Sequence, residues 1–258
     1  MSGKVYLIGA GPGDPELLTL KAARLLARAD VVLHDALVSR EVLAMISPTA
    51  EVIDVGKRAG RKLLTQDEIN SLLVSYAKTT DHVVRLKGGD PSIFGRAGEE
   101  IESLRKAGVE YEIVPGITAA LGAAAAAGIS LTDRRMASQI VLTTFSRETD
   151  GNVMDWGCVT STTTLVLYMP GADYAEVSAR LIDGGLPSEL PCVIVSNATS
   201  SSQELRWSNV GRLASEERLP APALLIVGRV ASHDVEEIRA SFWEGNRKNF
   251  DPRNVSVI

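Results

Sequence analysis

Cysteine, histidine and aromatic residues are scarce in this chain of 258 residues. The two cysteines, Cys158 and Cys192, each lie inside an apolar segment, so they are interpreted as small core residues of a reduced, cytosolic protein. The three histidines, His34, His82 and His233, are far apart along the sequence. We therefore expect neither a disulfide framework nor a bound metal.

Long apolar runs and an excess of positive charge are also missing. The most extended weakly polar stretch, residues 117–131, is shorter than the roughly 20 residues that cross a bilayer. The first four residues lead directly into a short apolar run, unlike a signal peptide. The formal charge is 27 − 32 = −5, which argues against binding nucleic acid by bulk charge. We expect a soluble cytoplasmic protein without membrane or nucleic-acid partners.

Short runs of valine, isoleucine and leucine alternate with helical patterns through the first half of the chain. This order is typical of an α/β fold whose parallel sheet is buried on both faces. Thr65, three residues before Glu68, has the spacing of a capping box and indicates a helix start. The expected strands are residues 5–8, 31–34, 52–55, 83–86 and 112–114, and the expected helices are residues 15–28, 66–78, 97–106 and 118–127.

The pattern changes after residue 135, which predicts a second domain. An alternating segment at residues 203–210 predicts an antiparallel or edge strand. Other expected elements are strands at 139–142, 164–168, 193–195 and 224–227 and helices at 174–182 and 235–242. With about 150 residues per domain as a guide, we expect an N-terminal α/β domain at 1–135, a C-terminal α/β domain at 136–245 and a polar tail at 246–258.

A glycine-rich loop, residues 9–15, follows the first expected strand. Its G-x-G-x-G spacing, the missing N–H of Pro12 and the negative charge of Asp14 all oppose a phosphate-binding interpretation. Asp14 followed by Pro15 is typical of a helix cap. Three glycines in five residues let the backbone approach a ligand or a neighbouring segment closely. The pattern favours a ligand that is not anionic at this point.

Two further loops, residues 88–91 and 114–119, also follow expected strands. The first has the sequence Gly-Gly-Asp-Pro and the second is built from small residues. Each could be a tight turn before a helix. Alternatively, the loops could form the ligand crevice that open α/β sheets carry at the carboxyl ends of their strands.

Basic residues gather locally despite the negative net charge. They could form either a solvated surface patch or a binding site for a polyanionic substrate. The residues are Lys57, Arg58, Arg61, Lys62, Arg85, Lys87, Arg96, Arg134 and Arg135. Asp35 follows the strand expected at 31–34 and could be a turn residue or a general base. Met169, after the strand expected at 164–168, is interpreted as a core residue when taken alone.

Taken in order, these segments resemble the tetrapyrrole (corrin/porphyrin) methyltransferase family over about residues 3–240. The run at 83–100 is the most specific, and it resembles the first methylating enzymes more than the later precorrin methylases. The matching segments are GAGPGDPELLTLKA (9–22), VVLHDALVS (31–39), VGKRAG (55–60), VVRLKGGDPSIFGRAGEE (83–100), VPGITAA (114–120), GISLTDR (128–134), YMPG (168–171) and PALLIVGR (222–229).

The resemblance implies a fold of two α/β domains with S-adenosylmethionine held in the cleft between them. It implies successive C-methylation of uroporphyrinogen III at C2 and C7, giving precorrin-2 through precorrin-1 and leaving S-adenosylhomocysteine. The partners that it implies are a polycarboxylate tetrapyrrole and a second copy of the chain. A cationic sulfonium suits loops whose charges are Asp14 and Asp90.

The family's functional residues carry over to matching positions of this sequence. Asp35 corresponds to the proposed base, Lys57 to the proposed proton donor and Arg96 to an arginine near the substrate. The implied cofactor contacts are Pro12, Gly88, Gly89, Asp90, Ile93, Thr118, Ala119, Met169, Ala198, Pro222 and Ala223.

The chain departs from the family's pattern at several positions, all outside the first-half glycine loops. These are Ser130, Asp133, the segment Thr144-Phe145-Ser146, Pro170 and Ala198. Three alternatives therefore remain open: a later precorrin methyltransferase, a ribosomal-RNA 2′-O-methyltransferase of related fold, and a tetrapyrrole-binding protein without catalysis.

Overall fold

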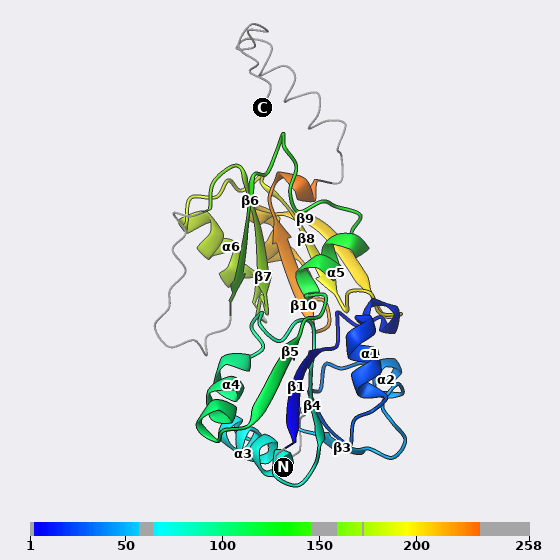
Figure 1. Ribbon diagram of the computed structural model, residues 1–258. Coiled ribbons are helices and arrows are strands. Elements are labelled where there is room, and N and C mark those ends of the chain that lie inside the picture. Colours follow the sequence, from blue (N-terminus) through cyan, green and yellow to red (C-terminus); the bar gives the residue numbers. More distant parts are fainter. Residues whose placement is uncertain (1–2, 57–63, 146–158, 172, 233–258) are drawn as a thin grey trace, which may run out of the picture. The chain divides into compact units, whose positions relative to one another are not determined.

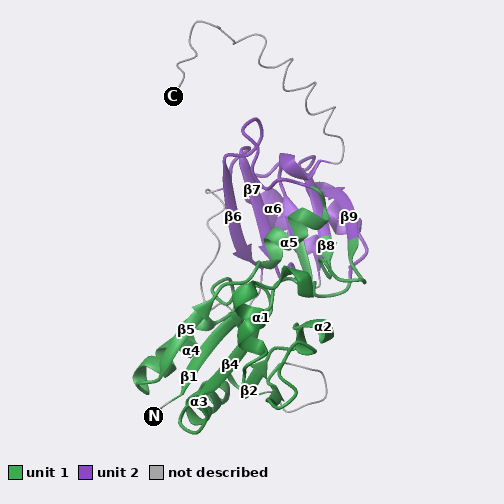
Figure 2. Cartoon of the chain, turned by 45° about the vertical axis from the view of Figure 1, so that its right-hand side comes forward, with its two compact units in different colours: residues 1–128, 195–204, 220–224 green, residues 129–194, 205–219, 225–258 purple. Residues whose placement is uncertain are grey.

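The chain folds into two units that each have their own sheet (Figures 1 and 2). The computed structural model describes residues 3–56, 64–145, 159–171 and 173–232. Unit 1 contains residues 1–128, 195–204 and 220–224, and unit 2 contains the remainder. The expected helix at 235–242 and the tail at 246–258 lie outside the described residues, as do Cys158 and His233. The domain boundary expected near residue 135 stays a prediction.

The sheet of unit 1 has five strands in the order β3-β2-β4-β1-β5. Every neighbouring pair is parallel, as expected, so the carboxyl ends of all five strands lie at one edge. Each expected strand is present, with bounds that differ by at most two residues at either end. The strands are β1 (Lys4–Gly9), β2 (Val31–His34), β3 (Glu51–Asp54), β4 (His82–Lys87) and β5 (Glu110–Val114).

Helices cover both faces of this sheet (Figure 1). Because side chains alternate along a strand, neighbouring strand residues contribute to different cores. Ile8 and Val32 pack with α1 (Leu20–Leu26) and α2 (Arg40–Leu43). Leu7 and Leu33 pack with α3 (Gln66–Ala77) and α4 (Ala97–Lys106). The remaining helix of unit 1 is α5 (Ala119–Ala126).

The starts of α1, α2 and α3 are fixed by capping side chains. At α3 the predicted capping box is confirmed: Glu68 N donates to Thr65 Oγ1 at 3.2 Å, and Thr65 N donates to Glu68 Oε2 at 2.7 Å. The single helix predicted at residues 15–28 is wrong. A 3-10 turn, η1 (Pro15–Leu17), is followed by extended backbone at Leu18, and α1 starts afresh after the N-cap Thr19.

Unit 2 has a second five-stranded sheet, in the order β6-β7-β10-β8-β9. The helix α6 (Tyr174–Asp183) packs on it together with the 3-10 helix η3 (Val210–Ser215). The predicted edge strand is confirmed as β9. The strands are β6 (Gln139–Thr144), β7 (Thr163–Tyr168), β8 (Pro191–Ser196), β9 (Glu204–Asn209) and β10 (Ala223–Val227).

Cys192 in β8 is a core residue, as its apolar neighbours in the sequence indicate. Its side chain has no solvent exposure, and burial raises the pKa of the thiol to about 12. Of the helices that the structure describes, none has the length and apolar character needed to cross a bilayer.

Candidate functional site

Four loops with the predicted site residues follow adjacent strands of unit 1. Residues 10–14 follow β1, residues 35–39 follow β2, residues 88–96 follow β4 and residues 115–118 follow β5. The strand order β2-β4-β1-β5 places these loops side by side at the carboxyl edge of the sheet. This edge is where open α/β sheets bind their ligands.

The glycine-rich loops after β1, β4 and β5 touch through their backbones. Gly11 N donates to Gly89 O at 3.1 Å, and Gly89 N donates to Gly11 O at 2.8 Å. A Cβ at Gly9 would lie 2.5 Å from Gly89 O, and a Cβ at Gly116 would lie 2.3 Å from the same atom. The close approach that the sequence predicted is therefore made to neighbouring segments. The N–H groups of Gly11 and Gly89 are used by this contact.

Asp90 joins the second loop to the third. Its Oδ2 accepts a hydrogen bond from Gly116 N at 3.0 Å, and its Oδ1 accepts from Ser92 N at 2.8 Å and from Ser92 Oγ. Gly88, Gly89 and Ile93 beside it are half-buried. The loops thus combine a carboxylate with closely packed main chain, which fits a cationic ligand such as a sulfonium better than a phosphate.

Pro12 and the N-terminus of α5 lie together in unit 1. A Cβ at Gly122 would lie 2.6 Å from Pro12 Cβ, so the first loop packs directly on α5. Thr118 is the N-cap residue of that helix, and Thr118 and Ala119 are half-buried. Three of the predicted cofactor contacts are therefore close to one another.

A segment from the second half of the chain packs on the first glycine loop. Asp14 N donates to Thr199 Oγ1 at 3.1 Å, and Asn197 N donates to Pro222 O at 2.9 Å. The predicted contacts Ala198, Pro222 and Ala223 consequently belong to unit 1. Sequence reasoning missed Thr199, since a single threonine in a serine-rich segment carries no signal of its own.

Met169 is the one predicted cofactor contact in unit 2. It follows β7 with φ 50°, and the residue is 50% exposed. The interpretation of Met169 as a core residue is therefore wrong. A non-glycine residue with this backbone conformation is uncommon and is often found at ligand sites.

Asp35 is joined to a network of charged side chains inside unit 1. Arg85 Nη2 donates to Asp35 Oδ1, and Arg85 Nε donates to Glu100 Oε1 at 2.8 Å. Lys87 Nζ donates to the same Glu100 oxygen at 2.8 Å. The Arg85, Lys87 and Glu100 side chains are at most 3% exposed, whereas the Asp35 side chain is 31% exposed.

The interpretation of Arg85 and Lys87 as parts of a surface patch or substrate clamp is wrong. Both lie in β4, a strand buried on both faces, and their side chains are on the same face as α4. Burial and the neighbouring Arg85 guanidinium lower the pKa of Lys87, despite Glu100. At Arg85 burial is outweighed by the carboxylates of Asp35 and Glu100, which raise the pKa of Arg85.

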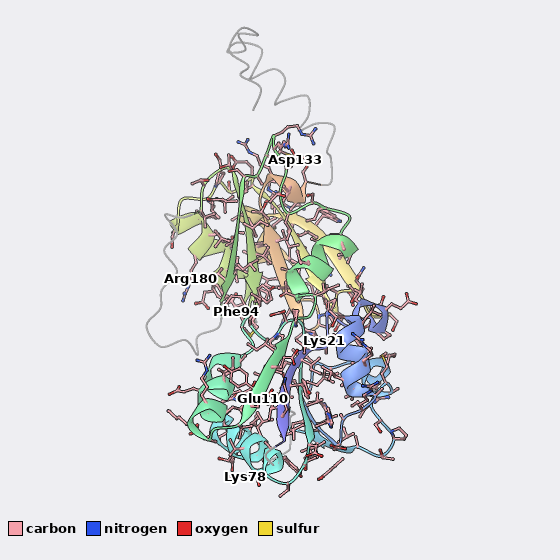
Figure 3. The ribbon with its side chains drawn as sticks, viewed as in Figure 1. Lys21, Lys78, Phe94, Glu110, Asp133 and Arg180 are labelled. Carbon is pink, nitrogen blue, oxygen red and sulfur yellow. The ribbon has the colours of Figure 1, made fainter. Side chains whose placement is uncertain are left out.

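Arg96 lies where the loop after β4 meets α4. It is the N-cap residue of that helix with φ 55°, and its Nη2 is 2.7 Å from Glu99 Oε2. Phe94, two residues earlier, is 42% exposed and has φ 52° (Figure 3). The loop therefore presents a guanidinium and an aromatic ring toward solvent.

Other predicted site residues lie elsewhere. Lys57 lies outside the described residues, as do Arg58, Arg61 and Lys62. Arg135 is paired with Asp133 at 2.6 Å in unit 2. Phe145, which departs from the family's pattern, has the Arg180 guanidinium 5.0 Å from its ring centroid. Over the described ranges, no three potential ligand residues are grouped as a metal site.

Comparisons with known proteins give one consistent result. The family model of tetrapyrrole (corrin/porphyrin) methylases matches residues 4–214. A uroporphyrinogen-III C-methyltransferase of Pseudomonas aeruginosa is 46% identical over 92% of this chain and 98% of its own length. A siroheme synthase of Actinobacillus pleuropneumoniae serotype 7 is 48% identical over 88% of this chain. The chain spans 47% of that longer protein.

Solved structures agree with the sequence relatives. The crystal structure of a uroporphyrin-III C-methyltransferase from Thermus thermophilus, complexed with S-adenosylhomocysteine, superposes with a TM-score of 0.77 at 38% identity. The superposition covers 88% of this chain and 93% of the Thermus chain.

Proposed function

The chain belongs to the tetrapyrrole (corrin/porphyrin) methylase family, and on this premise we propose that it methylates uroporphyrinogen III at C2 and C7. Precorrin-1 would be the intermediate and precorrin-2 the product, with S-adenosylmethionine as the methyl donor. The observation that carries this proposal is the likeness to the Pseudomonas methyltransferase over almost the full length of both chains.

The loops of unit 1 are suited to holding the donor. S-adenosylmethionine, when bound, supplies a methyl group on a cationic sulfonium. Asp90, fixed by Gly116 and Ser92, adds negative charge beside small residues that let a ligand approach the main chain. We propose that the contacts are Pro12, Gly88, Gly89, Asp90, Ile93, Thr118, Ala119, Met169, Ala198, Pro222 and Ala223.

Methyl transfer to carbon is an in-line displacement in which positioning contributes most of the acceleration. A ring carbon forms a bond to the methyl group as the sulfur–methyl bond breaks, and S-adenosylhomocysteine leaves. One proton must then leave the macrocycle. Asp35 is half-exposed at the sheet edge, and we propose that its carboxylate accepts this proton.

Basic side chains would bind the carboxylates of the tetrapyrrole. Arg96 is exposed at the sheet edge, and Lys57 belongs to the basic segment after β3. We propose substrate binding for Arg96, and substrate binding or proton donation for Lys57. The homodimer and the cytoplasmic location likewise stay predictions.

The decisive experiment is incubation with S-adenosylmethionine and uroporphyrinogen III under anaerobic conditions, followed by mass analysis of the pigment. A gain of two methyl groups supports the proposal. Methyl gain on precorrin-2 but not on uroporphyrinogen III would instead identify a later precorrin methyltransferase. Tight pigment binding without methyl gain, beside an active control enzyme, would identify a binding protein. RNA binding that weakens steeply with salt would support the alternative function of a ribosomal-RNA 2′-O-methyltransferase.

A further inference from the structure

The network of Asp35, Arg85, Glu100 and Lys87 reaches solvent through Asp35. The other three side chains are at most 3% exposed. Burying charged groups is costly even when they are paired, and apolar side chains of similar size would often stabilise such a core equally well. A network of this kind inside a sheet–helix interface calls for an explanation beyond stability.

Glu100 is the centre of the network. Its Oε1 accepts from Arg85 Nε and Lys87 Nζ, each at 2.8 Å, and from Gln66 Nε2 at 3.4 Å. Its Oε2 is buried and has no hydrogen-bond partner within the described part of the chain. The ion pairs of the Glu100 carboxylate are therefore made with the two cations of β4, Arg85 and Lys87.

Arg85 connects Glu100 to Asp35 and is itself held rigidly. Its Nη1 donates to the carbonyl oxygens of Leu33 and Leu86, each at 3.3 Å, while Nε and Nη2 bond the two carboxylates. A guanidinium fixed at four points can orient the Asp35 carboxylate with little freedom.

We propose that Glu100 and Lys87 are positioning residues for Asp35. Through Arg85 they hold Asp35 Oδ1 in place, and their opposite charges belong to the same hydrogen-bonded network. This inference rests on the proposed function, in which Asp35 takes the proton that leaves the macrocycle. The network is formally neutral, with two carboxylates and two cations.

Several titratable groups surround Asp35 on the elements packed against it. β4 contributes Arg85 and Lys87, and α4 contributes Glu100. His34, at the end of β2, has its Nδ1 3.0 Å from Asp35 O, and Asp54 is its cross-strand partner in β3. α3 contributes the neutral amides Gln66 and Asn70.

The test uses two substitutions of opposite electrostatic sign. Glu100→Gln removes a negative charge, so Asp35 stays ionised to lower pH and the acid limb of the kcat/KM profile moves down by about half a pH unit to one unit. Lys87→Met removes a positive charge and moves the same limb up by about the same amount. The double variant restores neutrality, so its profile returns toward that of the parent enzyme.

A second readout does not depend on turnover. Carbon-13 NMR of aspartate carboxyl groups, with the Asp35 signal assigned from Asp35→Asn, follows the titration of Asp35 directly. The midpoint shifts down in Glu100→Gln and up in Lys87→Met. An inactive parent enzyme with these NMR shifts would overturn the proposed function and leave the network confirmed.

The matched controls are Glu102→Gln and Lys106→Met. These residues form an exposed ion pair, at 2.5 Å, on the same helix as Glu100. They change the same charges without touching the network, so neither midpoint moves. If Glu100→Gln fails to fold, the midpoints of Lys87→Met and of the double variant still test the proposal. Midpoints of folded variants that equal the parent's would overturn the proposal.

Discussion

Asp35 combines a fixed carboxylate orientation with exposure to solvent. One oxygen of its carboxylate is bound by Arg85, and the side chain remains 31% exposed at the edge where the glycine loops lie. A proton acceptor needs both a fixed orientation and access to the substrate. Asp35 offers the two together because it directly follows β2, a strand whose own side chains are all buried.

Replacing Asp35 by asparagine tests this position. Asparagine keeps the size and one acceptor oxygen for Arg85 but cannot take the proton, so we expect kcat to fall by about 10²–10⁴-fold. Binding of S-adenosylhomocysteine, measured by calorimetry, stays within about threefold because the cofactor loops are unchanged.

The control for this variant is Asp81→Asn, at the amino end of β4 on the opposite edge of the same sheet. It removes the same charge and leaves kcat unchanged. Full turnover by Asp35→Asn would show that another group accepts the proton.

At the scale of elements, the contact between the three glycine loops is sensitive to substitution. Gly116→Ala places a Cβ 2.3 Å from Gly89 O, an overlap that only backbone movement can relieve. We expect a loss of about 1–3 kcal/mol in the free energy of unfolding and at least tenfold weaker binding of S-adenosylhomocysteine. Urea unfolding and calorimetry measure the two effects.

Gly98→Ala is the matched substitution. Gly98 lies in the first turn of α4, where an added Cβ would point into open space. Alanine there raises the free energy of unfolding by roughly 0.4–1 kcal/mol and leaves cofactor binding unchanged. Equal effects of the two substitutions would mean that contact between the loops is not what requires glycine.

Elements with local signals were predictable from the sequence, and those that depend on distant partners were not. The capping box of Thr65 and Glu68 marked the start of α3 to the residue. The break in the helix expected at 15–28 was missed, although Thr19 is a good N-cap residue, because leucines on both sides continue a helical pattern.

The buried ion network shows the same limit for the candidate site. Arg85 lies within the apolar run at 83–86, and Lys87 directly follows it. Because central parallel strands are covered on both faces, these two residues could have indicated buried charges. Their partner Glu100 lies on a helix, and no sequence spacing reveals that pairing. The glycine loops, by contrast, were found because glycine patterns are local.

At the scale of the whole molecule, the two contact units do not follow the order of the chain. Residues 195–204 and 220–224 join unit 1, although they include end residues of β8, β9 and β10, which belong to the second sheet. Asp14 and Thr199 are hydrogen-bonded across 185 sequence positions. Unit 1 therefore requires residues from both halves.

A fragment of residues 1–135 tests this dependence. It retains the whole first sheet but lacks Thr199 and the predicted contacts Met169, Ala198, Pro222 and Ala223. We expect no detectable binding of S-adenosylhomocysteine by calorimetry, whereas the full chain binds. Circular dichroism establishes whether the fragment is folded. If it is unfolded, the variant Thr199→Val in the full chain tests the same dependence, and we expect this variant to bind S-adenosylhomocysteine several-fold more weakly. Parent-like affinity in a folded fragment would contradict the prediction.

The interleaving of the two units has a consequence for recombination between related genes. A chimaera joined at a single crossover near residue 135 would take the first glycine loop from one parent and the residues that pack on it from the other. Among active chimaeras, those that take residues 9–15, 195–204 and 220–224 from the same parent should outnumber those with a single crossover. Substrate preference is therefore best exchanged through strands and loops outside these three segments.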